Sequence, residues 1–452
     1  MKYLLLLLGF IPAFLVPELA RAQVGTSQGG ASQDAMLSLG ECVDILAKNN
    51  LTYRDAQLQA EAADAMWRQV KSQQLPSLAL GASQSVNLGR SIDRFTNAYI
   101  DQLYNSNYVG AGLDLTLFRG FQIQNQIRQN QLLRESAIES RTAILNAQTI
   151  LLVQAYVQVL ATRALNEAAL QQVEASQQQV DRVQKQVSAG VVGESALYEI
   201  KAQLANDRFD QVTALNNYRA ARLTLFQLLN LPPSDNVELE PLAPADQPNG
   251  TMNAEAIFED AQKVFPELRG AELRRQSFKY QVKSIKADNF PSLTLSSNFG
   301  AFYASTNASL DYFQQLNATR NGGLSVGLNI PLMGRWVTRP RVATARVQER
   351  IAQNQLDITR QQLRQAIEQA VLDANAASDR FAAAQSQLES LTMSFSVVES
   401  RLNAGTANIF EYSLAKANLA RAQANAIRSR YEHQMRQRLL QFYRQGGWNG
   451  VL

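Results

Sequence analysis

The sequence feature that most constrains the fold is an internal repeat. When the chain is shifted by 215 positions, Pro76–Leu78 falls on Pro291–Leu293 and Gly190 falls on Gly405. The match keeps this single offset, without a gap, as far as Leu204-Ala205. Equal loop lengths in the two copies mean that the chain follows the same path in space twice.

Each copy contains a long stretch that lacks proline. The two proline-free windows are 77–231 and 341–452. Gly190 and Gly193 interrupt the helical part of the first window, and Gly405 interrupts that of the second. Glycine most readily adopts the left-handed conformation that ends a helix. The sequence therefore predicts two helical hairpins whose tips lie at residues 190 and 405.

The predicted hairpins span about 120–230 and about 335–445. An outgoing helix from about 120 to about 188 would be roughly 100 Å long, whereas each returning helix would be about 57 Å long. The helical segments Leu51–Gln74 and Glu267–Asn289 can complete the return, bringing it to about 90 Å. One line of a coiled-coil seam repeats every seven residues along the first outgoing helix: Ile138, Leu145, Leu152 and Val159.

Between each of the repeat-related prolines, Pro76 and Pro291, and the long helix that follows it, the period of the apolar residues changes from that of a helix to two residues. Apolar residues there alternate with small or polar ones, as in strands of a transmembrane barrel or in an amphipathic hairpin on a soluble core. The predicted strands cover four segments: about 77–88, 108–118, 292–303 and 323–333. Because four strands cannot close a barrel and open edges in lipid are costly, the pattern predicts a homotrimer with twelve strands, roughly enough for a channel.

The N-terminal residues have the features of a secretory signal. Lys2 is followed by an apolar run and by Ala20-Arg21-Ala22, a cleavage-site pattern, so the signal peptide is expected to be 1–22. The only cysteine, Cys42, gives no disulfide framework and lies away from the junction where a lipid anchor would be attached. After the signal, we expect no apolar run long enough for a membrane helix.

Composition excludes two classes of function. The 43 basic and 39 acidic residues are interspersed and leave a net charge of only +4, so no basic stripe predicts nucleic-acid binding. One histidine and one cysteine provide neither a metal cluster nor a nucleophile and base pair, and no phosphate-binding glycine loop occurs. We expect no enzymatic activity, no cofactor and no metal site.

The order of signal peptide, helix, strand, loop, strand, long helix, glycine tip and returning helix, repeated twice, resembles the TolC-like outer-membrane efflux protein family. The two tips carry the most specific part of the resemblance: "VSAGVVGESALYEIKAQLA" and "LNAGTANIFEYSLAKANLA". The stretch "NLGRSIDRFTNAYIDQL" is similar to the first barrel loop of Bacteroidetes-type members. The resemblance covers nearly the whole chain after the signal peptide.

The resemblance implies a mainly α protein with a membrane β-barrel contribution. Two repeats of helix, strand, strand, long helix and helix, at 23–231 and 253–452, are then joined by an equatorial linker at 232–252. Three chains form a 12-stranded barrel in outer-membrane lipid, continued by a helical tunnel in the periplasm. A periplasmic adaptor (membrane fusion protein) docks at the tips, around Gly190, Val191, Gly405 and Thr406, and an inner-membrane pump of the RND or ABC type supplies energy.

In this reading the chain is the passive exit duct of a tripartite efflux or type I secretion system. Drugs, metal ions and secreted polypeptides all stay open as cargo. The alternative is a periplasmic coiled-coil adaptor or structural protein, which would contain the long helices without membrane strands.

The resemblance also implies a constriction near the tip, where family members carry two aspartates three residues apart. Alignment on Gly405 places Glu411 at the first position and Leu414 at the second, and the repeat twin of Leu414 is Glu199. We therefore expect Glu411 and Glu199 to narrow the tunnel, with Leu414 weakening the acidic ring. Glu411 can alternatively serve only the start of the returning helix, where an acid is favoured by the helix dipole.

Three further positions depart from the family pattern. Ala196, Leu402 and Ala407 stand where charged and tyrosine links hold the closed state in well-known members, and none of them can form such a bond. We expect packing to hold this tip more than charge does. The repeat-related pair Lys201 and Lys416 is interpreted as solvated helix positions.

Overall fold

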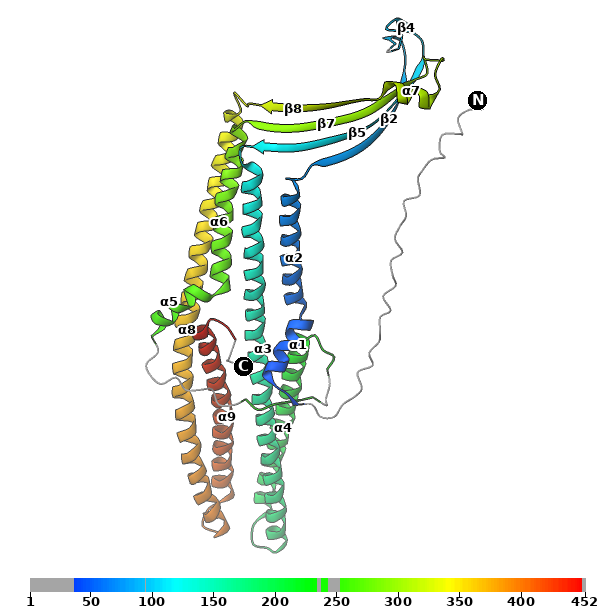
Figure 1. Ribbon diagram of the computed structural model, residues 1–452. Helices are drawn as coiled ribbons and strands as arrows, with labels where there is room; N and C mark the ends of the chain where they lie inside the picture. The colour runs from blue at the N-terminus through cyan, green and yellow to red at the C-terminus, as the bar shows by residue number, and fades with distance from the viewer. Residues whose placement is uncertain (1–35, 94, 234–236, 243–252, 449–452) are drawn as a thin grey trace, which may run out of the picture.

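A computed structural model describes residues 36–93, 95–233, 237–242 and 253–448 (Figure 1). The predicted signal peptide 1–22 lies outside the described residues, as does most of the predicted linker 232–252.

The predicted repeat of helix, strand, strand, long helix and returning helix is confirmed. The first copy contains α2 (Leu51–Ser72), β2 (Ser77–Asn87), β5 (Tyr104–Arg119), α3 (Gln122–Ser188) and α4 (Glu194–Leu228). The second copy contains α6 (Pro266–Lys286), β7 (Ser292–Ala304), β8 (Asn321–Asn329), α8 (Arg335–Asn403) and α9 (Ile409–Gln445). Figure 1 shows the strands at one end of an elongated helical body and the two tips at the other.

The long helices α3 and α8 run the whole length of this body. With 67 and 69 residues they span about 100 Å each. α4 packs along the lower part of α3 and α2 along its upper part, while α9 and α6 accompany α8 in the same way (Figure 1). α6 also packs against α3, which joins the two copies into one wall of helices near the strands.

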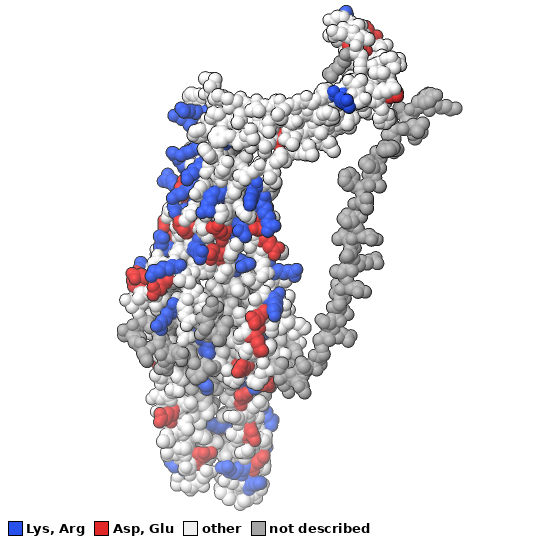
Figure 2. All heavy atoms as spheres, viewed as in Figure 1, with Lys and Arg blue, Asp and Glu red and all other residues white. Residues whose placement is uncertain are grey.

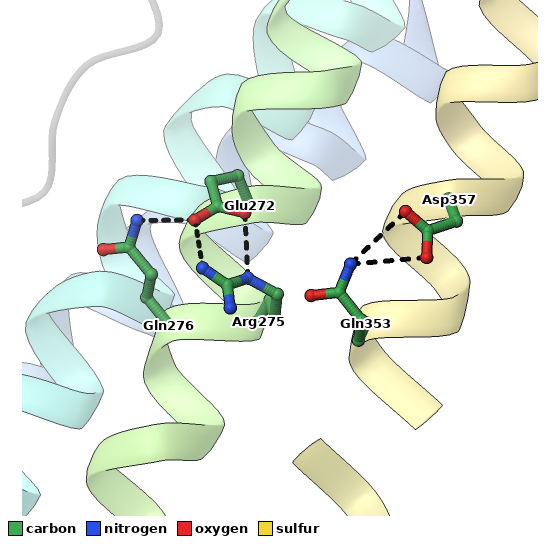
Figure 3. A network of polar contacts seen from close by, with 5 residues as sticks. All are labelled: Glu272, Arg275, Gln276, Gln353 and Asp357. Atoms are coloured by element: carbon green, nitrogen blue, oxygen red, sulfur yellow. Dashed lines mark hydrogen bonds and ion pairs between the residues drawn. The ribbon is translucent and has the colours of Figure 1, made fainter. Parts of the chain in front are cut away.

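Where α6 and α8 lie next to each other, polar side chains form hydrogen bonds within each of the two helices (Figure 3). Arg275 donates to both carboxylate oxygens of Glu272, at 2.9 and 2.6 Å, and Gln276 donates to the same carboxylate at 2.8 Å. On the facing helix, Gln353 donates to both oxygens of Asp357 at 3.3 Å. Such solvated networks add little stability, and they make this part of the wall a hydrophilic surface.

The four longer strands form one antiparallel sheet in the order β2-β5-β7-β8. Its register places Leu78 opposite Leu113 and Leu295 opposite Val326, so large apolar side chains share one face. The other face carries small or polar residues, including the row Ala79, Gly112, Asn298 and Gly323. β2 and β8 are the edge strands and pair with no other strand on their outer sides among the described residues.

The loops beyond the sheet contain more order than the sequence predicts. The first forms a small hairpin from β3 (Arg90–Ile92) and β4 (Tyr99–Asp101), and the second contains the helix α7 (Tyr312–Thr319). Asp311 caps α7 in a capping box with Gln314. Gln315 is fully buried: it accepts from Ala304 N–H at 3.0 Å and donates to the carbonyls of Asn307 and Leu310 at 2.9 Å, which fixes the loop on the end of β7.

A central apolar core lies at the middle of α3, where short elements wrap the helices. These elements are α1 (Leu39–Asn49), α5 (Ala254–Val264) and the parallel pair β1 (Met36–Leu37) and β6 (Glu238–Leu239). Leu152, Tyr156 and Phe442 are fully buried there. The Tyr156 hydroxyl lies 2.9 Å from the carbonyl of Leu37 and 2.7 Å from that of Glu240, and so connects α3 to the β1–β6 pair.

One expectation about the helices is wrong. Among the described residues, α3 contains a stretch of 18 residues that is apolar enough to cross a membrane by length and composition. A helix that runs through a protein core has the same composition, and 44% of the stretch is buried. Residues from Leu152 to Thr162 of α3 are largely buried, so packing in the central core accounts for this part of the apolar stretch.

Candidate functional site at the helical tips

The two tips have the same backbone geometry. Gly190 and Gly405 adopt left-handed conformations with φ of +72° and +74°. At the first tip, Val191 N–H donates to Gln186 O at 2.9 Å and Gly190 N–H to Val187 O at 2.9 Å. The equivalent bonds at the second tip run from Thr406 to Arg401 at 2.9 Å and from Gly405 to Leu402 at 3.0 Å. Both outgoing helices therefore end in a Schellman motif.

The space around the two glycines is open. A Cβ atom added at Gly190 or Gly405 would meet no atom within 4 Å of this chain. The glycines are thus required by backbone conformation rather than by close packing within the chain.

The two hairpins pack against each other just above the tips. Val183, Leu197, Ile200 and Tyr412 form the buried centre of an apolar cluster that draws on α3, α4 and α9. Ala196 and Leu402 pack against this cluster. Two of the three positions where the resemblance implies polar links, Ala196 and Leu402, are therefore occupied by packing residues.

The predicted constriction residues lie near the tips but are not joined. Glu411 is in the first turn of α9, where its N–H is capped by Asn408 Oδ1 at 2.7 Å. Its carboxylate lies 3.7 Å from Arg401 Nη1, an exposed ion pair. Glu199 is partly buried on α4, and no bond or ion pair links it to Glu411 among the described residues. Leu414 is 53% exposed.

The interpretation of Lys416 as a solvated residue is wrong. Its twin Lys201 is exposed, but Lys416 is only 4% exposed and lies between the hairpins. Its Nζ donates to Ser176 Oγ at 2.6 Å and lies 3.8 Å from Asp207 Oδ2. Ser176 Oγ also donates to Asp207, and Gln203 donates to the other carboxylate oxygen at 2.9 Å.

Two opposing effects act on the pKa of Lys416 in this cluster. Burial lowers the pKa of Lys416, and the neighbouring Asp207 carboxylate acts in the opposite direction. A charged lysine can stay in such a place only because an acid and a hydroxyl accompany it.

A signal for the buried cluster was present in the sequence. Ile200, Leu204 and Asp207 follow each other at helical spacing, so the acid continues an apolar stripe. Tyr412 and Lys416 stand one turn apart on α9 in the same way. A charge on an apolar stripe in each of two helices is a pattern typical of a buried pair.

The tips also expose apolar side chains. Val191 is 70% exposed, Tyr198 66% and Phe410 64%. Together with the glycine turns, they form a surface suited to contacts with other helices. Among the described residues, the tips offer no pair of nucleophile and base.

Known proteins share this architecture. A sequence profile described as outer membrane efflux protein matches residues 43–231 and 258–444, one segment in each repeat. Protein CyaE of Bordetella pertussis is 23% identical over 397 residues, covering 88% of this chain and 80% of that protein. Outer membrane protein TolC of Salmonella enteritidis is 24% identical over 403 residues, covering 86% and 78%.

Solved structures share the fold. The Campylobacter jejuni CmeC outer membrane channel matches with a TM-score of 0.77 at 17% identity, over 90% of this chain and 85% of that one. The prediction of a TolC-like fold, with a helical tunnel continuing a barrel, is confirmed by these matches. The Bacteroidetes-type assignment stays a prediction.

Proposed function

The chain belongs to the outer membrane efflux protein family, and from this premise we propose that it is the exit duct of a tripartite efflux or type I secretion system. The family consists of outer-membrane channels for efflux or secretion. In the proposed system an inner-membrane pump of the RND or ABC type supplies the energy. A periplasmic adaptor joins the pump to this passive channel.

The observation that carries the proposal is a four-stranded sheet with two free edges and one apolar face. In lipid, the unpaired backbone groups of β2 and β8 would each cost several kcal/mol. Three copies of the sheet, joined edge to edge, remove every free edge and enclose a barrel wide enough for a channel. This supports a homotrimer.

The two faces of the sheet suit lipid on one side and a lumen on the other. Leu80 is 84% exposed on the apolar face, and Leu324 of β8 is 72% exposed on the same face. In Figure 2 the sheet is almost free of charged side chains, whereas Lys and Arg gather on the helices next to it. Apolar strands bordered by cationic residues are typical of a protein seated in a membrane.

The alternative function, a periplasmic adaptor or structural protein, does not account for these strands. Such a protein has no need of an exposed apolar sheet to which each repeat contributes two strands, and in water this sheet would be an aggregation site. The long helices fit both functions, so the sheet favours the duct.

The tips are proposed as the adaptor-docking surface. Val191 and Thr406 follow the two left-handed glycines directly and are exposed. Helical hairpins of an adaptor can lie between neighbouring tips because the glycines leave open space there. We also propose that Glu411 and Glu199 narrow the tunnel at the end where the tips lie.

The proposal is tested by labelling both ends of the molecule on intact cells. Ala308, in the loop beyond the sheet, and Thr406, at the tip, are exposed positions for single cysteines. The native Cys42 does not interfere, because it is fully buried and burial raises its thiol pKa to about 12. A membrane-impermeant maleimide should label Ala308→Cys on intact cells and Thr406→Cys only after lysis.

Labelling of Ala308→Cys only after lysis would show that the loop does not face the outside, and would contradict an outer-membrane duct. Labelling of both positions on intact cells would equally contradict the proposed orientation. Wild-type protein, with Cys42 alone, is the matched control and should stay unlabelled until it is unfolded.

A further inference from the structure

The buried cluster of Lys416, Ser176 and Asp207 lies outside the docking surface and the constriction residues proposed above. Ser176 lies on α3 and Asp207 on α4, both in the first hairpin, whereas Lys416 lies on α9 in the second. All three side chains are at most 6% exposed. Outside the cluster, the contact between the hairpins near the tips consists mainly of apolar side chains.

An apolar contact between helices tolerates sliding, whereas a buried charge does not. Moving α9 by one residue along its axis shifts Lys416 by about 1.5 Å and turns it by about 100°. The ammonium group would then leave both Ser176 and Asp207, and two buried charges would lose their partners. A single buried polar group is known to fix helix register in coiled coils for this reason.

We propose that the Lys416–Ser176–Asp207 cluster is a register pin, which fixes how far and at what rotation the second hairpin lies on the first within one chain. The pin sits at the upper end of the apolar tip cluster, one helical turn from Tyr412. It therefore sets the relative height of the two tips, Val191 and Thr406, that an adaptor contacts in the proposed function.

The repeat shows that the pin belongs to one kind of hairpin contact only. By the 215-residue offset, the twins of Lys416, Asp207 and Ser176 are Lys201, Ala422 and Leu391. Those three residues cannot form the same cluster, because the acid and the hydroxyl are replaced by apolar residues. In the proposed trimer, the contact between hairpins of one chain is pinned, and the pseudo-equivalent contact between neighbouring chains lacks this pin.

Other charged groups around the pin do not replace its members. Burial lowers the pKa of Lys416, whereas Asp207 and Glu399, on α8, raise it. Burial and Glu399 raise the pKa of Tyr412, whereas Arg182, on α3, lowers it. Arg182 donates instead to Asn403 Oδ1 at 3.0 Å, closer to the tip. Asp207 is the acid with which Lys416 forms an ion pair among the described residues.

Double electron–electron resonance between two spin labels measures the distance between the two tips of one chain and so tests the pin. Spin labels on Val191→Cys and Thr406→Cys, in labelled chains diluted with unlabelled ones, give the within-chain distance. With the pin intact, one narrow distribution is expected. In Lys416→Met with Asp207→Leu, which leaves no unpaired charge, the distribution should broaden at least twofold while helix content stays unchanged.

Lys201→Met is the matched control, since Lys201 is the exposed twin of Lys416, and its distribution should stay narrow. If the apolar pair does not fold, Lys416→Gln with Asp207→Asn serves instead; the shorter amide cannot reach Ser176, so broadening is expected again. If a double variant folds and its distance distribution is as narrow as that of the protein with the pin intact, the pin is overturned.

The pin rests on the proposed function for two points, the contrast between the two kinds of contact and the docking of an adaptor at the tips. The within-chain distance can be measured whatever the oligomeric state, and the particle mass reports that state separately. Failure of the pin and failure of the proposed function are therefore distinguishable.

Discussion

Single residues at the tips act through backbone conformation, and those at the hairpin contact act through burial. The sequence predicts the turns at Gly190 and Gly405 because the long helical part of each proline-free window contains almost no other glycine. Lys416 was misassigned because its surroundings come from α3 and α4, about 210 to 240 positions earlier in the chain. A charged residue within an apolar stripe of one helix indicates a buried ion pair only when a helix packed against it carries the opposite charge within its own apolar stripe.

Replacing Gly405 by Val should affect the tip and spare the rest of the chain. A β-branched residue in the left-handed conformation costs about 2 kcal/mol, and no neighbouring atom blocks the side chain itself. Ala404→Val, one residue earlier at a helical φ of −82°, is the matched control. Export should fall strongly in Gly405→Val and little in Ala404→Val, with equal amounts of assembled protein in membranes. Loss of assembly in Gly405→Val would show that the glycine serves folding.

Glu411→Gln tests the proposed constriction. If three copies of Glu411 meet near the axis, their charges attract cations into the lumen, so the substitution should lower cation selectivity in planar bilayers. Arg401→Gln is the useful comparison, because it removes the cation 3.7 Å away and should raise selectivity. Unchanged selectivity and conductance in Glu411→Gln, alone and with Glu199→Gln, would mean that Glu411 serves only the first turn of α9.

At the scale of elements, length and periodicity decided what the sequence could predict. The long helices and the four sheet strands were predicted because helical or two-residue periodicity persists over many residues. The elements α1, α5, α7, β1 and β6 were missed. They are short, and they depend on caps such as Asp311 or on contacts such as that of Tyr156 with Glu240.

The wrap of short elements around the middle of α3 depends on the Tyr156 hydroxyl. Tyr156→Phe removes the hydroxyl that both carbonyls share: the Leu37 carbonyl still accepts from Glu240 N–H at 3.0 Å, whereas the Glu240 carbonyl loses this donor, which should cost about 1 kcal/mol. Tyr198→Phe, at an exposed position on α4, is the matched control and should cost almost nothing. Thermal unfolding followed by circular dichroism compares the two. Equal midpoints in both variants would show that the hydroxyl does not hold the wrap.

At the scale of the whole molecule, two copies of one path give a body with a membrane-suited sheet at one end and two glycine tips at the other (Figure 1). The sequence predicted this arrangement because one offset aligns both halves. The height of one hairpin relative to the other was not predictable from the repeat, since the buried pin has no twin. It depends on Lys416, Ser176 and Asp207, which only the fold brings together.

In the proposed channel, three chains join their sheets edge to edge. Light scattering, with the contribution of the detergent subtracted, gives the mass of the detergent-solubilised particle and so counts its chains. Three chains per particle are expected, since three four-stranded sheets leave neither β2 nor β8 with a free edge. A particle that contains one or two chains would contradict the account.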